Sequence, residues 1–223
     1  MNKTLLNFDA LKKGIGYLVL FFILPGLVTI PFIFIKNQTP LLENIETIIS
    51  YAGTTIIFII ISFKELKKDF KSFSFKIFKK ALLYWIVGLI LMVISSTIIN
   101  LIGIPIPANE AANDNNLLDN PIIQILMGVI FFPIIEEIVF RLSVKDLSSN
   151  KHVYAISTGL FFALMHVPEA LSSPIMLLHL IPYASCGIAF GYSYKNTNNI
   201  MSTITTHSLH NLLNILQFII LGG

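Results

Sequence analysis

Long runs of apolar residues separated by short polar segments dominate the hydropathy pattern of the chain. A helix needs roughly 20 mostly apolar residues to cross the hydrocarbon core of a bilayer, because each residue adds about 1.5 Å along the helix axis. Seven runs meet or approach this length: 14–35, 47–63, 81–102, 121–142, 152–168, 174–194 and 199–221. The pattern predicts an all-α fold, a polytopic transmembrane helix bundle of about seven spans.

The composition indicates that the bilayer is the solvent of this protein. Of its 223 residues, 55% are hydrophobic and 12% are charged, and the mean hydropathy is +0.79. Soluble domains carry about 25% charged residues, and a soluble fold of this size could not hide so much apolar surface. The single cysteine, Cys186, lies in an apolar run, so we interpret it as a packing residue and expect no disulfide within the chain.

The basic residues predict the orientation of the bundle. Of the 15 lysines and arginines, all except Lys36 precede the first span, lie between spans 2 and 3, 4 and 5, or 6 and 7, or, in the case of Arg141, lie at the end of span 4 that faces the 4–5 loop. Basic loops face the cytoplasm, so we expect a cytoplasmic N-terminus and an external C-terminus. The composition is rich in Asn, Lys and Ile, from which we expect a bacterial, multi-pass protein of the plasma membrane.

The segment 64–80 between spans 2 and 3 holds seven lysines. Apolar residues recur between them at helical spacing: Phe63, Leu66, Phe70, Phe73 and Ile77. This pattern predicts a helix on the inner leaflet with its lysines near anionic headgroups, although an ordinary basic loop remains an alternative. No nucleic acid partner is expected, because nothing here resembles a base-reading module.

We predict one integral membrane domain in two parts, 1–120 with spans 1–3 and the basic segment, and 121–223 with spans 4–7.

Span 4 contains two adjacent acidic residues, which are costly inside a membrane and therefore need a reason. Glu137 lies four residues before Arg141, so the two can pair on one helix face. Glu136 points about 100° away and lacks that geometry. A carboxyl without a partner in a low-dielectric interior suits a general base, while a buried ion network that only fixes packing is the alternative.

Span 7 carries a polar stripe that faces the bundle interior. Its residues follow the i, i+4, i+8, i+11 pattern of one helix face: Thr203, His207, Asn211 and Asn214. His166 ends span 5, and the expected depths of Glu136, His166 and His207 allow them to share one layer. Pro133, three residues before Glu136, removes a backbone hydrogen bond and is expected to leave a carbonyl that a neighbour or water can use.

Three motifs on three late spans resemble those of the CAAX protease and bacteriocin-processing family, also called CPBP or Abi. They are Glu-Glu-x-x-x-Arg (Glu136, Glu137, Arg141), Phe-x-x-x-His (Phe162, His166) and His-x-x-x-Asn (His207, Asn211). The resemblance covers residues 121–215. It implies an intramembrane endopeptidase in which Glu136 and His166 activate a water, and His207 and Asn211 stabilise the oxyanion.

The resemblance further implies supporting roles for Glu137 and Arg141, and we add Phe162 and His210 to the supporting residues. The family has been described as a metallopeptidase and as a glutamate-dependent peptidase, so the cofactor is left open, with a divalent metal such as zinc as one possibility. If a metal is used, the expected ligands are Glu136, His166 and His207. No His-Glu-x-x-His motif marks a zinc site, and we favour a metal-free mechanism.

We therefore predict a protease that cleaves a peptide or membrane-anchored protein substrate near the cytoplasmic leaflet. In a bacterial setting we expect a peptide precursor or bacteriocin as the substrate and consider a prenylated protein less suitable. Two alternatives are open: a non-catalytic bacteriocin immunity or scaffold protein that keeps this fold, and a small proton-coupled transporter in which buried Glu and His residues relay protons.

Overall fold

The computed structural model describes residues 6–35 and 39–221. Within these residues the secondary structure is entirely helical. Lys3 and Lys36, which enter the argument on orientation, lie outside the described residues.

The elements follow one another as helices with short connections. They are α1 (Phe8–Thr29), η1 (Ile30–Phe34), α2 (Pro40–Ile61), α3 (Phe63–Ser72), α4 (Phe75–Leu101), α5 (Ala108–Asp119), α6 (Pro121–Leu126), η2 (Met127–Phe131), α7 (Phe132–Glu137), η3 (Ile138–Leu142), α8 (Lys151–His166), η4 (Pro168–Leu171), η5 (Pro174–His179), α9 (Leu180–Thr197) and α10 (Ile200–Leu221). Segments η2 and η3 are π-helical, so α6 to η3 form one continuous helix over 121–142.

Five helices in the described part of the chain are long and apolar enough to cross a membrane: 8–34, 40–61, 75–101, 121–142 and 174–197. The other two predicted spans are also helices. However, α8 has only 16 residues, about 24 Å at 1.5 Å each, and α10 is long enough but carries the polar stripe. The chain is thus an all-helical, multi-pass membrane protein, while the count of seven spans and the cytoplasmic N-terminus stay predictions.

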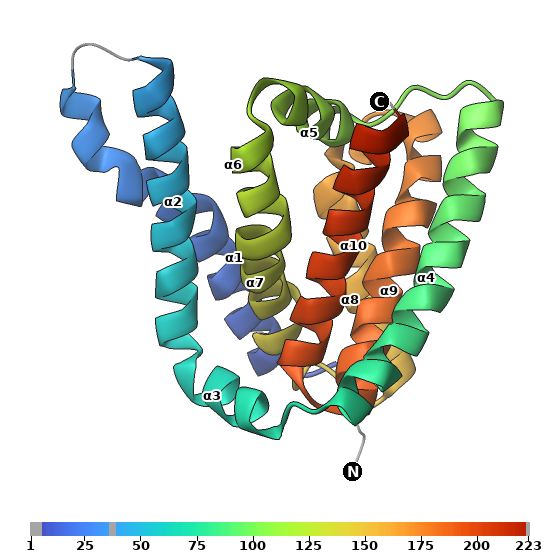
Figure 1. Ribbon diagram of the computed structural model, residues 1–223. Helices are drawn as coiled ribbons and strands as arrows, with labels where there is room; N and C mark the ends of the chain where they lie inside the picture. Colours follow the sequence, from blue (N-terminus) through green and yellow to red (C-terminus); the bar gives the residue numbers. More distant parts are fainter. Residues whose placement is uncertain (1–5, 36–38, 222–223) are drawn as a thin grey trace.

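The long helices run up and down through the bundle (Figure 1). The chain enters at the lower end of α1 and leaves at the upper end of α10, so the two termini lie at opposite ends. Helix α9 packs against both α8 and α4, and α10 packs against α4, α7 and α9. The α1–α2 hairpin packs on the 121–142 helix from the other side, which leaves this helix between the hairpin and α10.

The basic segment 64–80 forms two elements, so the expectation of a single helix there was wrong. Helix α3 ends at Ser72, and Phe73 adopts an extended backbone with φ −62° and ψ 133°. The Ser74 hydroxyl then accepts a hydrogen bond from the backbone N–H of Ile77 at 3.4 Å and begins α4. A serine at this position satisfies a free N–H group at a helix start, which stops the first helix and starts the next.

Glycines allow α8 and α9 to approach backbone to backbone. A Cβ atom on Gly159 would lie 2.5 Å from the backbone nitrogen of Ile188, and one on Gly187 would lie 2.9 Å from the carbonyl oxygen of Gly159. A Cβ on Gly191 would lie 2.7 Å from the Cα of Ala155. Gly187 and Gly191, four residues apart on α9, therefore pack closely on α8, where Gly159 supplies the facing surface.

Gly159→Ala should destabilise the protein strongly, because the added methyl group meets backbone that cannot rotate away. Overpacking of this kind costs about 1–3 kcal/mol or more. The midpoint of thermal unfolding in detergent measures the effect. Gly16→Ala is the matched control, since nothing lies within 4 Å of a Cβ at that helical glycine. Equal midpoints for the two variants would contradict this account of the α8–α9 contact.

Candidate active site

The helix over 121–142 departs from α-helical geometry on both sides of the two glutamates. In the π-helical segment η2, the N–H of Phe132 bonds to the carbonyl of Met127, five residues earlier. The next bond in this pattern would join residue 133 to Gly128, but Pro133 has no N–H group. The carbonyl of Gly128 instead accepts a hydrogen bond from the side-chain amide of Asn211 at 2.7 Å. The prediction that Pro133 leaves a backbone carbonyl free is thus confirmed, and the side-chain amide that donates to this carbonyl comes from α10.

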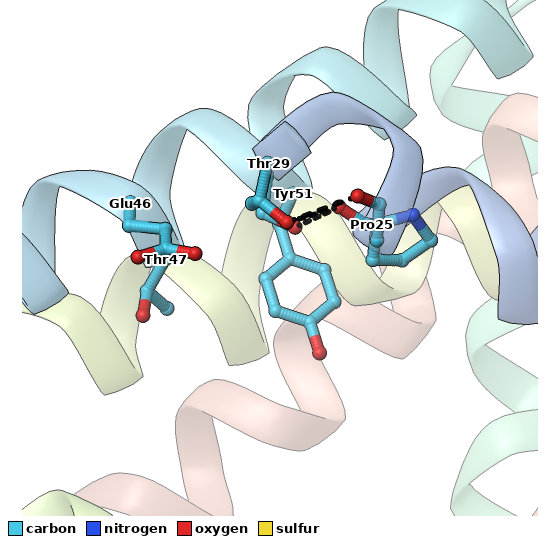
Figure 2. A pocket seen from close by; sticks show the side chains of 7 residues that line it. Pro25, Thr29, Glu46, Thr47 and Tyr51 are labelled. Atoms are coloured by element: carbon cyan, nitrogen blue, oxygen red, sulfur yellow. Dashed lines mark hydrogen bonds between the residues drawn. The ribbon is translucent and has the colours of Figure 1, made fainter. Parts of the chain in front are cut away.

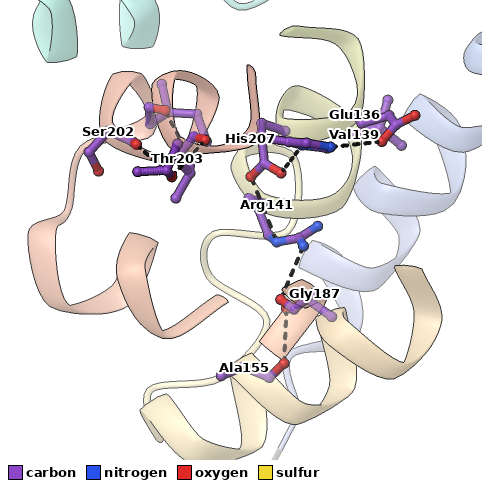
Figure 3. A network of polar contacts seen from close by, with 12 residues as sticks. Glu136, Val139, Arg141, Ala155, Gly187, Ser202, Thr203 and His207 are labelled. Atoms are coloured by element: carbon purple, nitrogen blue, oxygen red, sulfur yellow. Dashed lines mark hydrogen bonds and ion pairs between the residues drawn. The ribbon is translucent and has the colours of Figure 1, made fainter. Parts of the chain in front are cut away.

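Glu137 and Arg141 form a fully buried ion pair. Arg141 Nε lies 3.8 Å from Glu137 Oε2, and neither side chain has exposed surface. The guanidinium also donates from Nη2 to the carbonyl of Gly187 at 3.1 Å and lies 5.1 Å from the ring centroid of Phe162. The pairing predicted from the spacing is confirmed, and the close α8–α9 contact places the carbonyl of Gly187 beside the guanidinium (Figure 3). Nε and Nη1 of Arg141 have no hydrogen-bond partner among the described residues.

The structure brings Glu136 together with two histidines from separate helices. Glu136 Oε2 lies 3.7 Å from His207 Nε2 and 3.9 Å from His166 Nε2. Glu136 is only 9% exposed and therefore faces the bundle interior, where Figure 3 shows it beside His207. These distances exceed a direct hydrogen bond, but a single water beside the three atoms could contact all of them.

Both imidazole rings are held by their Nδ1 atoms. His166 Nδ1 lies 2.8 Å from the carbonyl oxygen of Phe162, and His207 Nδ1 lies 3.0 Å from Glu137 Oε1. A carbonyl only accepts, and a carboxylate paired with arginine also accepts, so each Nδ1 carries a hydrogen. The Nε2 atoms are therefore the ones that face Glu136.

Aromatic rings fix the planes of the two histidines. Phe190 stacks on His207 with centroids 4.8 Å apart and planes 24° apart, and Phe162 meets the same ring edge-on at 5.7 Å. Phe162 and Tyr183 lie 4.2 Å and 5.3 Å from the ring of His166. Phe162 was predicted as a support. Phe190 and Tyr183 were missed, because an aromatic residue in an apolar span gives no signal in a single sequence.

Asn211 and His210 lie farther along α10. The amide of Asn211 has two hydrogens, one of which is donated to Gly128. His210 is buried, its Nε2 lies 3.3 Å from the amide nitrogen of Asn214, and its ring meets Phe190 edge-on. His210 thus touches the aromatic ring that packs on His207, and its supporting role stays a prediction.

A metal would need donors that surround one point. Two imidazole Nε2 atoms and one carboxylate are ligands that zinc accepts. Yet in the described residues no group of three or more His, Cys, Asp or Glu side chains is arranged to hold a metal ion. The conditional ligand set Glu136, His166 and His207 stays an expectation, and the steps proposed below use the side chains alone.

Two hollows in the described part of the chain lie away from Glu136. One of about 260 Å³ lies between α1 and α2 and contains polar side chains, among them Thr29, Glu46 and Tyr51 (Figure 2). Another of about 440 Å³ lies between α4 and α9 and is lined mainly by isoleucine and leucine. Around Glu136, the most accessible group is His166, whose side chain is 20% exposed against 3% for His207.

Comparison with known families agrees with the motifs. Residues 118–213 match the family model described as type II CAAX prenyl endopeptidase Rce1-like. This match contains all the predicted site residues and confirms the resemblance to the CAAX protease family over that segment. No curated protein and no solved structure matches the chain.

Arg141→Met should cost about 3–5 kcal/mol of stability, because it leaves the carboxylate of Glu137 buried without its partner. Thermal unfolding in detergent measures this loss. Lys12→Met removes a lysine from an exposed pair with Asp9 and should leave the midpoint unchanged. Adding Glu137→Gln to Arg141→Met should restore part of the stability, since no lone charge then remains. A double variant less stable than Arg141→Met would contradict the charge argument.

Proposed function

We propose that this protein is an intramembrane endopeptidase in which Glu136 promotes the hydrolysis of a peptide bond in the substrate. The premise is that residues 118–213 carry a CAAX protease segment. The observation that carries the proposal is the approach of two histidine Nε2 atoms to one carboxylate oxygen, at 3.7 and 3.9 Å. These groups come from three helices and are the acid, base and hydrogen-bonding side chains that peptide hydrolysis needs.

Charge balance assigns different protonation states to the two histidines. Arg141, Glu137, His207 and Glu136 follow one another through contacts of 3.8, 3.0 and 3.7 Å. If His207 carries a proton on both nitrogens, positive and negative groups alternate along this series and the buried network is neutral. A neutral His207 would leave a net negative charge in a low-dielectric interior, which is costly. We therefore assign His207 as an imidazolium held by Glu137.

His166 has no carboxylate behind it. Its Nδ1 hydrogen is used by the carbonyl of Phe162, so a neutral ring offers a lone pair on Nε2. A water beside Glu136 and His166 can donate one hydrogen to each of them. This arrangement directs a lone pair of the water oxygen away from both groups and toward a bound peptide carbonyl.

The reaction then proceeds in two steps. The water oxygen forms a bond to the carbonyl carbon, and Glu136 takes the proton that the water loses. The carbonyl oxygen becomes an oxyanion, to which His207 Nε2–H and the second amide hydrogen of Asn211 donate. When the carbon–nitrogen bond breaks, Glu136 returns the proton to the leaving amine. The products are a carboxylate and an amine.

The name of the matched family suggests a prenylated protein end as one substrate class, while a peptide precursor is the class expected from the composition. The position of Glu136 inside the bundle favours a membrane-anchored substrate in both cases. A scaffold or immunity protein would not need a buried carboxylate facing two histidines. A proton-coupled transporter would need a continuous polar path, whereas the hollows found in the described chain lie away from Glu136.

Glu136→Gln should lower the rate of cleavage by about 10²–10⁴-fold, because the amide keeps the shape of the side chain but cannot accept the proton. The rate is followed by mass spectrometry on the protein in proteoliposomes, with a farnesylated CAAX peptide and with the membrane peptides of the host cell as substrates. Unfolding midpoints of both proteins control for folding.

Glu46→Gln is the matched control, since Glu46 lines the hollow between α1 and α2 instead of the site. Wild-type cleavage by Glu136→Gln would overturn the enzyme proposal. If removal of the whole protein abolishes a cellular phenotype and Glu136→Gln keeps that phenotype fully, the result would instead favour the scaffold alternative.

His207→Gln should lower the rate of cleavage by about 10²–10³-fold, because the neutral glutamine amide donates a weaker hydrogen bond to the oxyanion than His207 does. The rate is measured by the same mass-spectrometric assay in proteoliposomes. His152→Gln, at an exposed histidine, should keep the wild-type rate. A wild-type rate in His207→Gln would refute the role of His207 at the oxyanion.

A further inference from the structure

Helix α3 lies across the lower end of the bundle, beside the start of α10 (Figure 1). Its inner face is short and buried, with Leu66 9% and Asp69 4% exposed. Its other faces carry exposed lysines and phenylalanines: Phe63, Lys64, Lys67, Lys68, Phe70 and Lys71. A solvated loop explains the lysines, but it does not explain two large aromatic side chains that remain exposed beside them.

The exposed residues are ordered along the helix. Phe63, Lys67 and Phe70 follow the i, i+4, i+7 pattern and form one stripe. Lys67 Nζ lies 5.6 Å from the ring centroid of Phe63. Aromatic rings beside lysines on a helix at the membrane surface insert between headgroups, while the ammonium groups attract anionic lipids. The charge and the aromatic groups of this surface are thus complementary to anionic phospholipid.

The buried face of α3 holds the beginning of α10. Asp69 Oδ2 accepts a hydrogen bond from the backbone N–H of Ile200 at 2.8 Å, and the backbone carbonyl of Asp69 accepts one from the Asn199 amide at 2.7 Å. The first N–H groups of a helix lack partners within the helix, and a negative charge near them is favourable. A carboxylate on α3 therefore caps the helix that carries His207.

A second contact joins α3 to the chain that follows the 121–142 helix. Lys145 Nζ lies 3.4 Å from Glu65 Oε1. Burial acts to raise the pKa of Glu65, but its backbone hydrogen bond and Lys145 hold that pKa below the usual value. Glu65 is therefore ionised in this pair, and α3 contacts two of the three helices that supply the site, at the start of α10 and just after the end of the 121–142 helix.

We infer that α3 is a docking surface for anionic phospholipid headgroups, and that docking orders the first turns of α10 through Asp69. The consequence for His207, seven residues into α10, rests on the proposed function, whereas docking and ordering do not. Anionic lipid would then determine how well the first turns of α10, at the lower end of the site, are ordered.

Hydrogen exchange on the full-length protein in nanodiscs tests the inference. One set of nanodiscs contains phosphatidylcholine, and the other contains equal parts of phosphatidylcholine and phosphatidylglycerol. Amides of α3 and of residues 200–204 should exchange at least three-fold more slowly in the anionic nanodiscs. High salt should remove the difference, because it screens exposed charges.

The triple variant Lys64→Gln, Lys67→Gln and Lys71→Gln should abolish this difference, since each lysine contributes roughly five-fold to attraction by an anionic surface. The matched control replaces Lys12, Lys13 and Lys151, three exposed lysines outside α3, with glutamine and should retain the difference. Asp69→Ala, which removes the side-chain acceptor of the Ile200 N–H, should keep slow exchange in α3 but lose it in residues 200–204.

Equal exchange in the two lipids, or equal loss of the effect in both triple variants, would overturn the inference. Slowing confined to α3 in the wild-type protein would overturn the coupling to α10. Neither readout uses peptide cleavage, so a failure of the proposed function would be recognised separately.

Discussion

The buried pair of Glu137 and Arg141 is the contact on which the interior of this protein depends. Both side chains are fully buried, so each charge needs a partner in place of water. Their separation by one helical turn brings them together, but a guanidinium has five N–H donors and one carboxylate does not satisfy them all. The carbonyl of Gly187 supplies a further acceptor, and it can do so because glycine allows α9 to approach closely. The glycine contact between α8 and α9 is thus also a requirement of the charge pair.

Helix α10 has the length of a membrane span and carries the polar side chains that contact the 121–142 helix. Its side chains support the 121–142 helix at two levels, because His207 bonds to Glu137 and Asn211 bonds to the carbonyl that Pro133 leaves free. These polar groups lower its hydropathy, which explains why α10 has the length of a span without the composition of one. Of the five more apolar helices, those over 75–101, 121–142 and 174–197 pack against α10. All five contribute hydrophobic surface that the bilayer requires.

The sequence predicts much of this arrangement because the bilayer restricts the possible structures. All seven apolar runs are helices, the helix at 121–142 has the predicted ends, and the spacing of Glu137 and Arg141 predicts their pairing. The orientations of the histidine rings could not be predicted. They depend on the carbonyl of Phe162 and on the ring of Phe190, contacts that form only when separate helices meet. The end of α3 at Ser72 was missed for a local reason, since the capping serine lies within an otherwise continuous apolar pattern.

The short length of α8 explains why His166 is partly exposed. This helix ends at His166, directly before Val167 and Pro168, and a residue that precedes proline is disfavoured in α-helical geometry. The chain therefore turns away after about 24 Å, less than the roughly 30 Å of a bilayer core. His166 thus lies at a helix end, where fewer neighbouring turns cover it, and its side chain is 20% exposed. In a full-length span, the next helical turn would cover this ring and close the most accessible side of Glu136.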